Sequence, residues 1–187
     1  MARDAEERSD PGWVGRDHTN GSIAMADKDL RALFLHQLKD TYFAEGAIAK
    51  ALPIMAQAAR SAELKGAFGV HVEETKNQIK RLDQVFRLIG EKPEGIECKA
   101  IQGIVAEGEE VMSEFGGSSA IDAGLISAAQ AIEHYEITRY GTLLAWAKQL
   151  ELSEAAGLLK ETLVEEENTD ELLSELAEEA ANPVAAA

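Results

Sequence analysis

The chain has 187 residues, of which 34 are acidic and 18 are basic, and its formal net charge is −16. This length fits a single domain, and a hydrophobic content of 45 % fits a folded chain rather than a disordered one. The acidic excess argues against nucleic acid and against a polybasic membrane contact, because both require clustered positive charge. The charge favours cations as partners, so the question is whether any carboxylates are placed to bind one.

The cysteine content and the N-terminal sequence narrow the class further. The single cysteine, Cys98, excludes an internal disulfide framework and a thiolate zinc site. No run of about 20 apolar residues is present, and the segment MARDAEERSD lacks the apolar stretch of a secretory signal. We therefore expect a cytoplasmic protein. Residues 1–26 have no hydrophobic period and predict a flexible N-terminal tail.

Hydrophobic periodicity predicts four long helices after this tail. Apolar residues recur every three or four positions, as on the buried face of a helix. Pro53 falls inside the first pattern and predicts a kink or local break there. The helices form a domain over residues 27–181, and residues 182–187 are predicted to be a disordered tail. The predicted helices are residues 27–59, 63–89, 120–150 and 153–180.

The connection between the second and third helices, residues 91–121, is unusually long. It contains a short amphipathic segment that Gly103 and Gly108 should weaken. Short turns join the other helices, so the chain forms two antiparallel hairpins. A connection of about 30 residues can run the length of a bundle, whereas an up-and-down bundle needs only a short loop. The sequence therefore predicts an all-α, ferritin-like four-helix bundle whose long crossover carries a short extra helix.

Several ionisable residues fall within the apolar faces of these helices. A helix turns about 100° per residue, so a position's spacing from the apolar residues shows which way its side chain points. By this criterion every long helix carries at least one inward or sector-edge carboxylate near its middle. The candidates are Glu45 on the first helix, His71 and Glu74 on the second, Glu133 and Glu136 on the third, and Glu166 and Asp170 on the fourth.

Taken together, these seven residues predict a dinuclear metal site. An unpaired buried carboxylate is costly when ionised, and few lysines or arginines share these sectors. Two divalent cations would supply the missing positive charge and suit oxygen ligands plus imidazole. The segments HVEETKN (71–77) and LVEEENT (163–169) are also alike, as an approximate twofold site would require. Taken singly, Glu74 also fits a surface carboxylate, and His71 fits a core histidine.

Four segments resemble the YciE/YciF family of ferritin-like proteins (DUF892): LKDTYFAEGAIAKALP, HVEETKNQIKRLDQVF, CKAIQGIVAEG and AAQAIEHYEITRYGTLLAWA. The resemblance covers about residues 28–180. It implies a ferritin-like four-helix fold, a homodimer, a dinuclear iron site and induction under stress in bacteria.

The ligand pattern departs from the wider ferritin-like one, which takes Glu-x-x-His from two helices. Asn77 follows Glu74 by three residues and Thr169 follows Glu166 by three, so neither motif is present. An oxygen-rich ligand set suits harder ions, which keeps manganese open as an alternative to iron.

The leading hypothesis is a ferroxidase-type protein in which O₂ or peroxide oxidises Fe(II). A non-catalytic helical dimer that binds a partner under stress is one alternative, and a manganese catalase-like or peroxidase activity at the same site is another. The expected core ligands are Glu45, Glu74, Glu136 and Glu166, with His71, Glu133 and Asp170 as auxiliaries.

Overall fold

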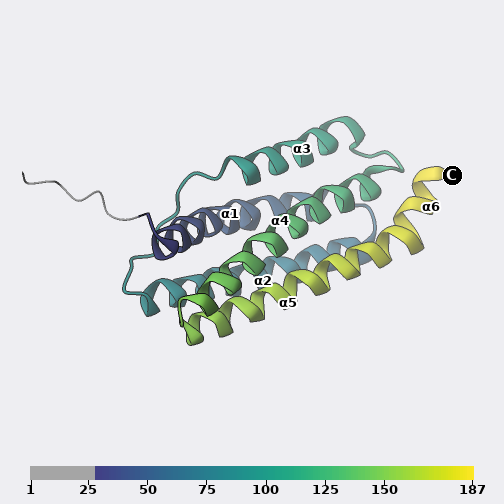
Figure 1. Cartoon of the computed structure of the whole chain (residues 1–187). Helices are drawn as coiled ribbons and strands as arrows, with labels where there is room; N and C mark the ends of the chain where they lie inside the picture. Colours follow the sequence, from purple (N-terminus) through teal and green to yellow (C-terminus); the bar gives the residue numbers. More distant parts are fainter. Residues whose placement is uncertain (1–27) are drawn as a thin grey trace, which may run out of the picture.

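The computed structural model describes residues 28–187, and this part of the chain is helical with no strand. The expected tail at residues 1–26 lies outside the described residues. The elements in chain order are α1 (Leu30–Ala58), α2 (Ala62–Leu88), α3 (Lys99–Phe115), α4 (Ile121–Gln149), α5 (Ser153–Leu176), the π-helical segment η1 (Ala177–Ala181) and α6 (Asn182–Ala186) (Figure 1).

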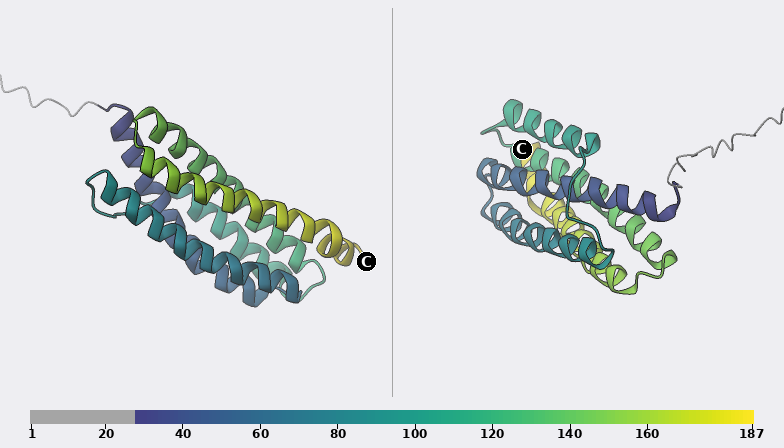
Figure 2. Two further views of the ribbon diagram at one scale, coloured as in Figure 1. Left: turned by 90° about the horizontal axis from the view of Figure 1, so that it is seen from below. Right: turned by 90° about the vertical axis from the view of Figure 1, so that its left-hand side faces the viewer.

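Four long helices form the bundle, as the sequence predicts. Helix α1 packs against α2 and α4, and α5 packs against the same two helices (Figures 1 and 2). Helix α3 lies outside this bundle, against α1 and α4, and carries the chain back along it. As a result α2 and α4 begin at the same end of the molecule. This is the ferritin-like arrangement of two hairpins and one crossover.

Side-chain caps fix where the helices begin. The Asp29 carboxylate accepts a hydrogen bond of 2.8 Å from the Ala32 N–H, at the start of α1. Asp122 lies in the first turn of α4. It accepts hydrogen bonds from the N–H groups of Arg60 (2.7 Å) and Ser61 (2.9 Å), the two residues that precede α2. These two bonds hold the α1–α2 turn against the start of α4. Helix α1 continues through Pro53, so the predicted break is absent.

Helix α3 is longer and better packed than the sequence predicts. It has 17 residues, and Ile101 is fully buried. Gly108 and Gly124 lie at the contact between α3 and α4. A Cβ added at Gly108 would make an ordinary contact of 3.5 Å with the Ala128 Cβ, whereas one added at Gly124 of α4 would lie 2.6 Å from the Val111 Cγ1. A side chain at Gly124 would therefore have to displace Val111.

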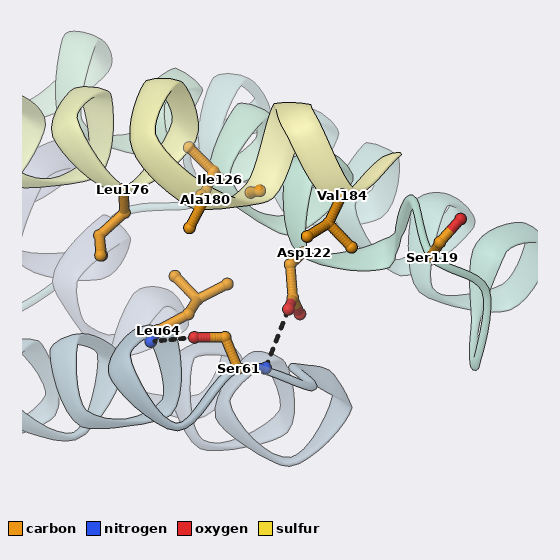
Figure 3. A pocket seen from close by; sticks show the side chains of 9 residues that line it. Ser61, Leu64, Ser119, Asp122, Ile126, Leu176, Ala180 and Val184 are labelled. Carbon is orange, nitrogen blue, oxygen red and sulfur yellow. Dashed lines mark hydrogen bonds between the residues drawn. The ribbon is translucent and has the colours of Figure 1, made fainter. Parts of the chain in front are cut away.

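The C-terminus is also helical, so the predicted disordered tail at residues 182–187 is wrong. Alanine favours helix, and Pro183 falls in the first turn of α6, where proline needs no amide hydrogen. Figure 3 shows that this segment covers the end of the bundle. Val184 lines a cavity of about 70 Å³ there, across from α2 and beside Asp122 of α4.

The core has two apolar halves separated by a polar layer. One half contains Phe68, Leu125 and Ile132, and the other contains Phe34 and Phe86. Within residues 28–187, no helix is long and apolar enough to cross a membrane. The buried polar layer between the two halves consists of Thr41, Glu45, His71, Thr75, Gln78, Glu133, Glu136, Thr162 and Glu166.

Candidate metal centre

Four glutamates and one histidine form the ionisable part of the polar layer, and we call them the acidic centre: Glu45 from α1, His71 from α2, Glu133 and Glu136 from α4, and Glu166 from α5. Each is at most 2 % exposed. The residues from α4 are three apart, so they share one face of the helix. The four bundle helices thus bring five potential ligands to one level of the core.

The ligand atoms lie close enough to share an ion. His71, Glu133, Glu136 and Glu166 each offer one atom, and these atoms lie within 4.8 Å of one another. The His71 Nε2 is 3.7 Å from the Glu133 Oε1. Nitrogen and oxygen ligands about 2.0–2.2 Å from a metal lie roughly 3–4.4 Å apart around it, so a small contraction would close the shell.

Glu45 extends the centre on the α1 side. The Tyr140 hydroxyl donates a hydrogen bond to the Glu45 Oε1. Glu45 lies outside the group of four residues whose ligand atoms are within 4.8 Å of one another, but its charge helps to raise the pKa of Glu136. The place of Tyr140 four residues after Glu136 puts it on the same inward face of α4.

Most polar atoms of the acidic centre have no hydrogen-bond partner in the structure. Burial of such atoms is costly, and native proteins rarely leave them unpaired. Within residues 28–187, no lysine or arginine forms an ion pair with any of the four glutamates. The unpartnered atoms are Glu45 Oε2, His71 Nδ1 and Nε2, Glu133 Oε2, and both carboxyl oxygens of Glu136 and Glu166.

Burial shifts every pKa in the centre toward the neutral form. It raises the pKa of Glu45 to about 8 and that of Glu133 to about 8, and it lowers the pKa of His71 to about 4. Burial, reinforced by the neighbouring carboxyl groups, holds the pKa values of Glu136 and Glu166 well above the usual range. Without a cation, protons must neutralise the carboxyl groups. A neutral imidazole and several carboxyl groups are a ligand set that suits iron or manganese.

Arg81, whose charge lowers the pKa of Glu45, is already paired. Arg81 of α2 binds both oxygens of Glu165 on α5, with an Nη1–Oε2 distance of 2.7 Å. Gln78 donates a 3.1 Å hydrogen bond to the same carboxylate. Sequence reasoning missed this pair. The signal was the spacing of Gln78 and Arg81, which places both on the side of α2 that faces α5.

Two of the seven predicted ligands lie at the border of the acidic centre. The Glu74 side chain is 34 % exposed, and its Oε2 is 4.0 Å from the His71 Nδ1. Asp170 accepts a 3.2 Å hydrogen bond from Gln130 and lies 3.4 Å from the exposed His134. Glu74 and Glu166 hold the same place in the similar segments 71–77 and 163–169, but Glu166 is buried and Glu74 is not, since α2 turns His71 inward instead. The other five predicted residues are the acidic centre itself.

A helical bundle with one long crossover and a buried layer of carboxyl groups and imidazole defines a ferritin-like protein. Comparison with known proteins gives the family. The profile described as Domain of unknown function (DUF892) matches residues 29–186, and the chain belongs to that family. The resemblance inferred from the four sequence segments is therefore confirmed.

The relatives agree in sequence and fold. Protein YciF of Escherichia coli strain K12 is 44 % identical over 151 residues, which are 80 % of this chain and 91 % of that one. The crystal structure of that stress protein superimposes with a TM-score of 0.79 and covers 83 % of this chain and 98 % of that chain.

Two further solved structures share the fold. YcfI of Rhodopseudomonas palustris, described as a candidate structural protein, has a TM-score of 0.78 at 41 % identity and covers 81 % of this chain and 97 % of its own. A protein from Xanthomonas campestris pv. campestris, at 22 % identity, has a TM-score of 0.66 over 83 % of this chain and 94 % of its own. At this identity, the last match supports the fold alone.

Proposed function

We propose that the acidic centre binds two divalent cations and that the protein oxidises Fe(II) with O₂ or peroxide as the electron acceptor. The observation that carries this proposal is the set of buried, unpartnered ligand atoms in the centre. Apolar side chains at these positions would make the core at least as stable, so stability alone does not explain the buried carboxyl groups. Cations would neutralise the carboxylates and give the orphaned atoms partners.

The positions of the ligand atoms suggest which residues would hold each metal ion. His71, Glu133, Glu136 and Glu166 would hold one ion, because their ligand atoms lie within 4.8 Å of one another, and Glu45 would contribute a carboxylate to the second ion from the α1 side. The Tyr140 hydroxyl holds the Glu45 carboxylate in one orientation. The carboxylates, which carry protons without a cation, would release them to solvent as the ions bind.

The reaction needs no further group from the chain. Two Fe(II) substrates lose one electron each, and O₂ with two protons becomes hydrogen peroxide, or one peroxide with two protons becomes two water molecules. The apolar halves above and below the centre exclude water from those two sides. The carboxylate side chains can shift to follow the ions as their charge rises from two to three.

The test is anaerobic titration with Fe(II), followed by O₂ and detection of near-ultraviolet absorbance from Fe(III). We expect about two Fe(II) per chain and an absorbance rise in the wild type. Glu166→Gln should lose both, and Glu167→Gln should keep both because Glu167 is exposed on the same helix. Equal behaviour of the two variants would contradict the assignment of Glu166.

The alternatives give different results in the same preparation. Oxygen release from peroxide by manganese-loaded protein, without Fe(II) oxidation, would replace the ferroxidase proposal with a catalase-like one. A folded wild-type protein that binds neither metal would leave only a non-catalytic, partner-binding role.

A further inference from the structure

A cavity of about 120 Å³ leads from the surface to one side of the acidic centre. It lies where α2 and α5 run side by side (Figure 2). His71 and Glu133 line its inner end, and both side chains are at most 3 % exposed. Asn168 and Thr169 line it from α5. The acidic centre is therefore connected to solvent on the His71 side.

Glu74 lies between solvent and the inner end of this cavity. Its side chain is 34 % exposed, and its Oε2 is 4.0 Å from the His71 Nδ1. Both nitrogens of His71 lack hydrogen-bond partners, so this buried ring is free to bind a cation that arrives through the cavity. Glu74 is the one carboxylate among the lining residues that reaches solvent, since Glu133 is 1 % exposed.

The size and rim of the cavity restrict what can enter. Pockets for organic ligands typically measure about 300–1,000 Å³, and a water molecule occupies about 30 Å³ of the liquid. A volume of about 120 Å³ thus suits a small inorganic species rather than an organic substrate. Val70 and Leu172 at the rim are exposed and apolar and offer a cation no ligand. Glu74 is the attractive group on the route.

We propose that this cavity is the uptake port for divalent cations and that Glu74 is a transfer ligand. Glu74 binds the arriving ion, passes it to His71 and Glu133, and does not hold it afterwards. The inference rests on the proposed function, because it concerns the route to the same centre. A transfer ligand speeds uptake and release by the same factor and leaves affinity unchanged, whereas a resident ligand raises affinity and slows release.

The test uses Co²⁺ as the probe, because its visible absorbance reports binding without any turnover. Uptake is followed by stopped-flow mixing of metal-free protein with Co²⁺, and release by mixing loaded protein with EDTA. Glu74→Gln should slow both rates by about tenfold, at the lower end of electrostatic effects on association, with the dissociation constant unchanged. Glu73→Gln is the matched control, since Glu73 is 70 % exposed and pairs with Lys76.

A second pair of variants tests the route rather than the charge. Ala67 lines the cavity from α2, so Ala67→Phe should fill it and slow uptake and release. Ala62→Phe places the same side chain at an exposed position of the same helix and should change neither rate. Circular dichroism and the melting temperature show whether each variant is folded.

The outcomes separate the two proposals. Parallel slowing of uptake and release by Glu74→Gln supports the transfer role. Faster release with weaker affinity would make Glu74 a resident ligand, and unchanged rates in both Glu74→Gln and folded Ala67→Phe would place the route elsewhere. The first result overturns the transfer role of Glu74 and the second overturns the port, while the centre still binds Co²⁺ in both. A wild-type protein that binds neither Co²⁺ nor Fe(II) would overturn the proposed function itself.

Discussion

Metal-free protein should lose stability as the pH rises from 6.5 to 8. The folded state holds protons on Glu45 and Glu133, whose pKa values are raised from 4.5 to about 8, whereas the unfolded chain has released them by pH 6.5. Because the folded state binds more protons, its stability falls with pH. Each proton contributes up to about 1.4 kcal/mol per pH unit, so these two groups give a slope of up to about 2.7 kcal/mol per unit that flattens toward pH 8, or about 3 kcal/mol over the interval. The raised pKa values of Glu136 and Glu166 act in the same direction.

His71 changes how the free energy of unfolding depends on pH below 6.5. Its pKa is lowered from 6.5 to about 4 in the folded state, so below pH 6.5 the unfolded chain binds this proton more readily. The histidine therefore adds stability as the pH rises from 4 to 6.5 and cancels part of the carboxyl effect there. The steepest loss should lie above pH 6.5.

The assay is urea unfolding in the presence of a chelator at pH 6.5, 7.25 and 8. Glu45→Gln removes one of the titrating groups and should reduce the slope by up to about 1.4 kcal/mol per pH unit. Saturating Mn²⁺ should reverse the trend, because ions displace the protons and bind better at higher pH. Stability that is constant or rises between pH 6.5 and 8 without metal would refute the account of the buried carboxyl groups.

Two other substitutions test supporting contacts. Asp122→Ala removes the acceptor for the Arg60 and Ser61 N–H groups and should lower the free energy of unfolding by about 1–2 kcal/mol, measured by chemical denaturation, with metal affinity unchanged. An equal loss of metal affinity would show that this end of the bundle is coupled to the centre. Tyr140→Phe removes a hydrogen bond that lowers the pKa of Glu45, so metal affinity at pH 7 should fall by roughly tenfold in a competition titration. Unchanged affinity would mean that the hydroxyl does not act through Glu45.

The helices and the inward residues could be predicted from the sequence because both follow from one period. Glu45, Glu133, Glu136 and Glu166 occupy positions at three- and four-residue spacing from apolar neighbours, and the structure buries all four. His71 follows the same rule. Local periodicity is sufficient to predict burial wherever a residue lies near the middle of the apolar face of its helix.

The remaining features of the site and the fold depend on contacts between helices, and the periodicity of one helix does not predict such contacts. Glu74 lies at the edge of its face, so whether it is buried depends on how closely α5 approaches α2. Gly108 and Gly124 look like weak helix positions in isolation, yet they are where α3 and α4 approach. The pairing of Arg81 with Glu165 likewise joins residues 84 positions apart.

The most direct test of the account is the metal content of the folded protein. Wild type and Glu136→Gln are loaded with Fe(II) anaerobically at pH 7.5, desalted and measured by elemental analysis against protein concentration. Glu136 is fully buried and belongs to the cluster of ligand atoms within 4.8 Å of one another, so we predict about two ions per chain in the wild type and fewer than one in the variant. A folded wild-type protein that retains no metal, or a variant that retains as much as the wild type, would contradict the assignment of the acidic centre as a metal site.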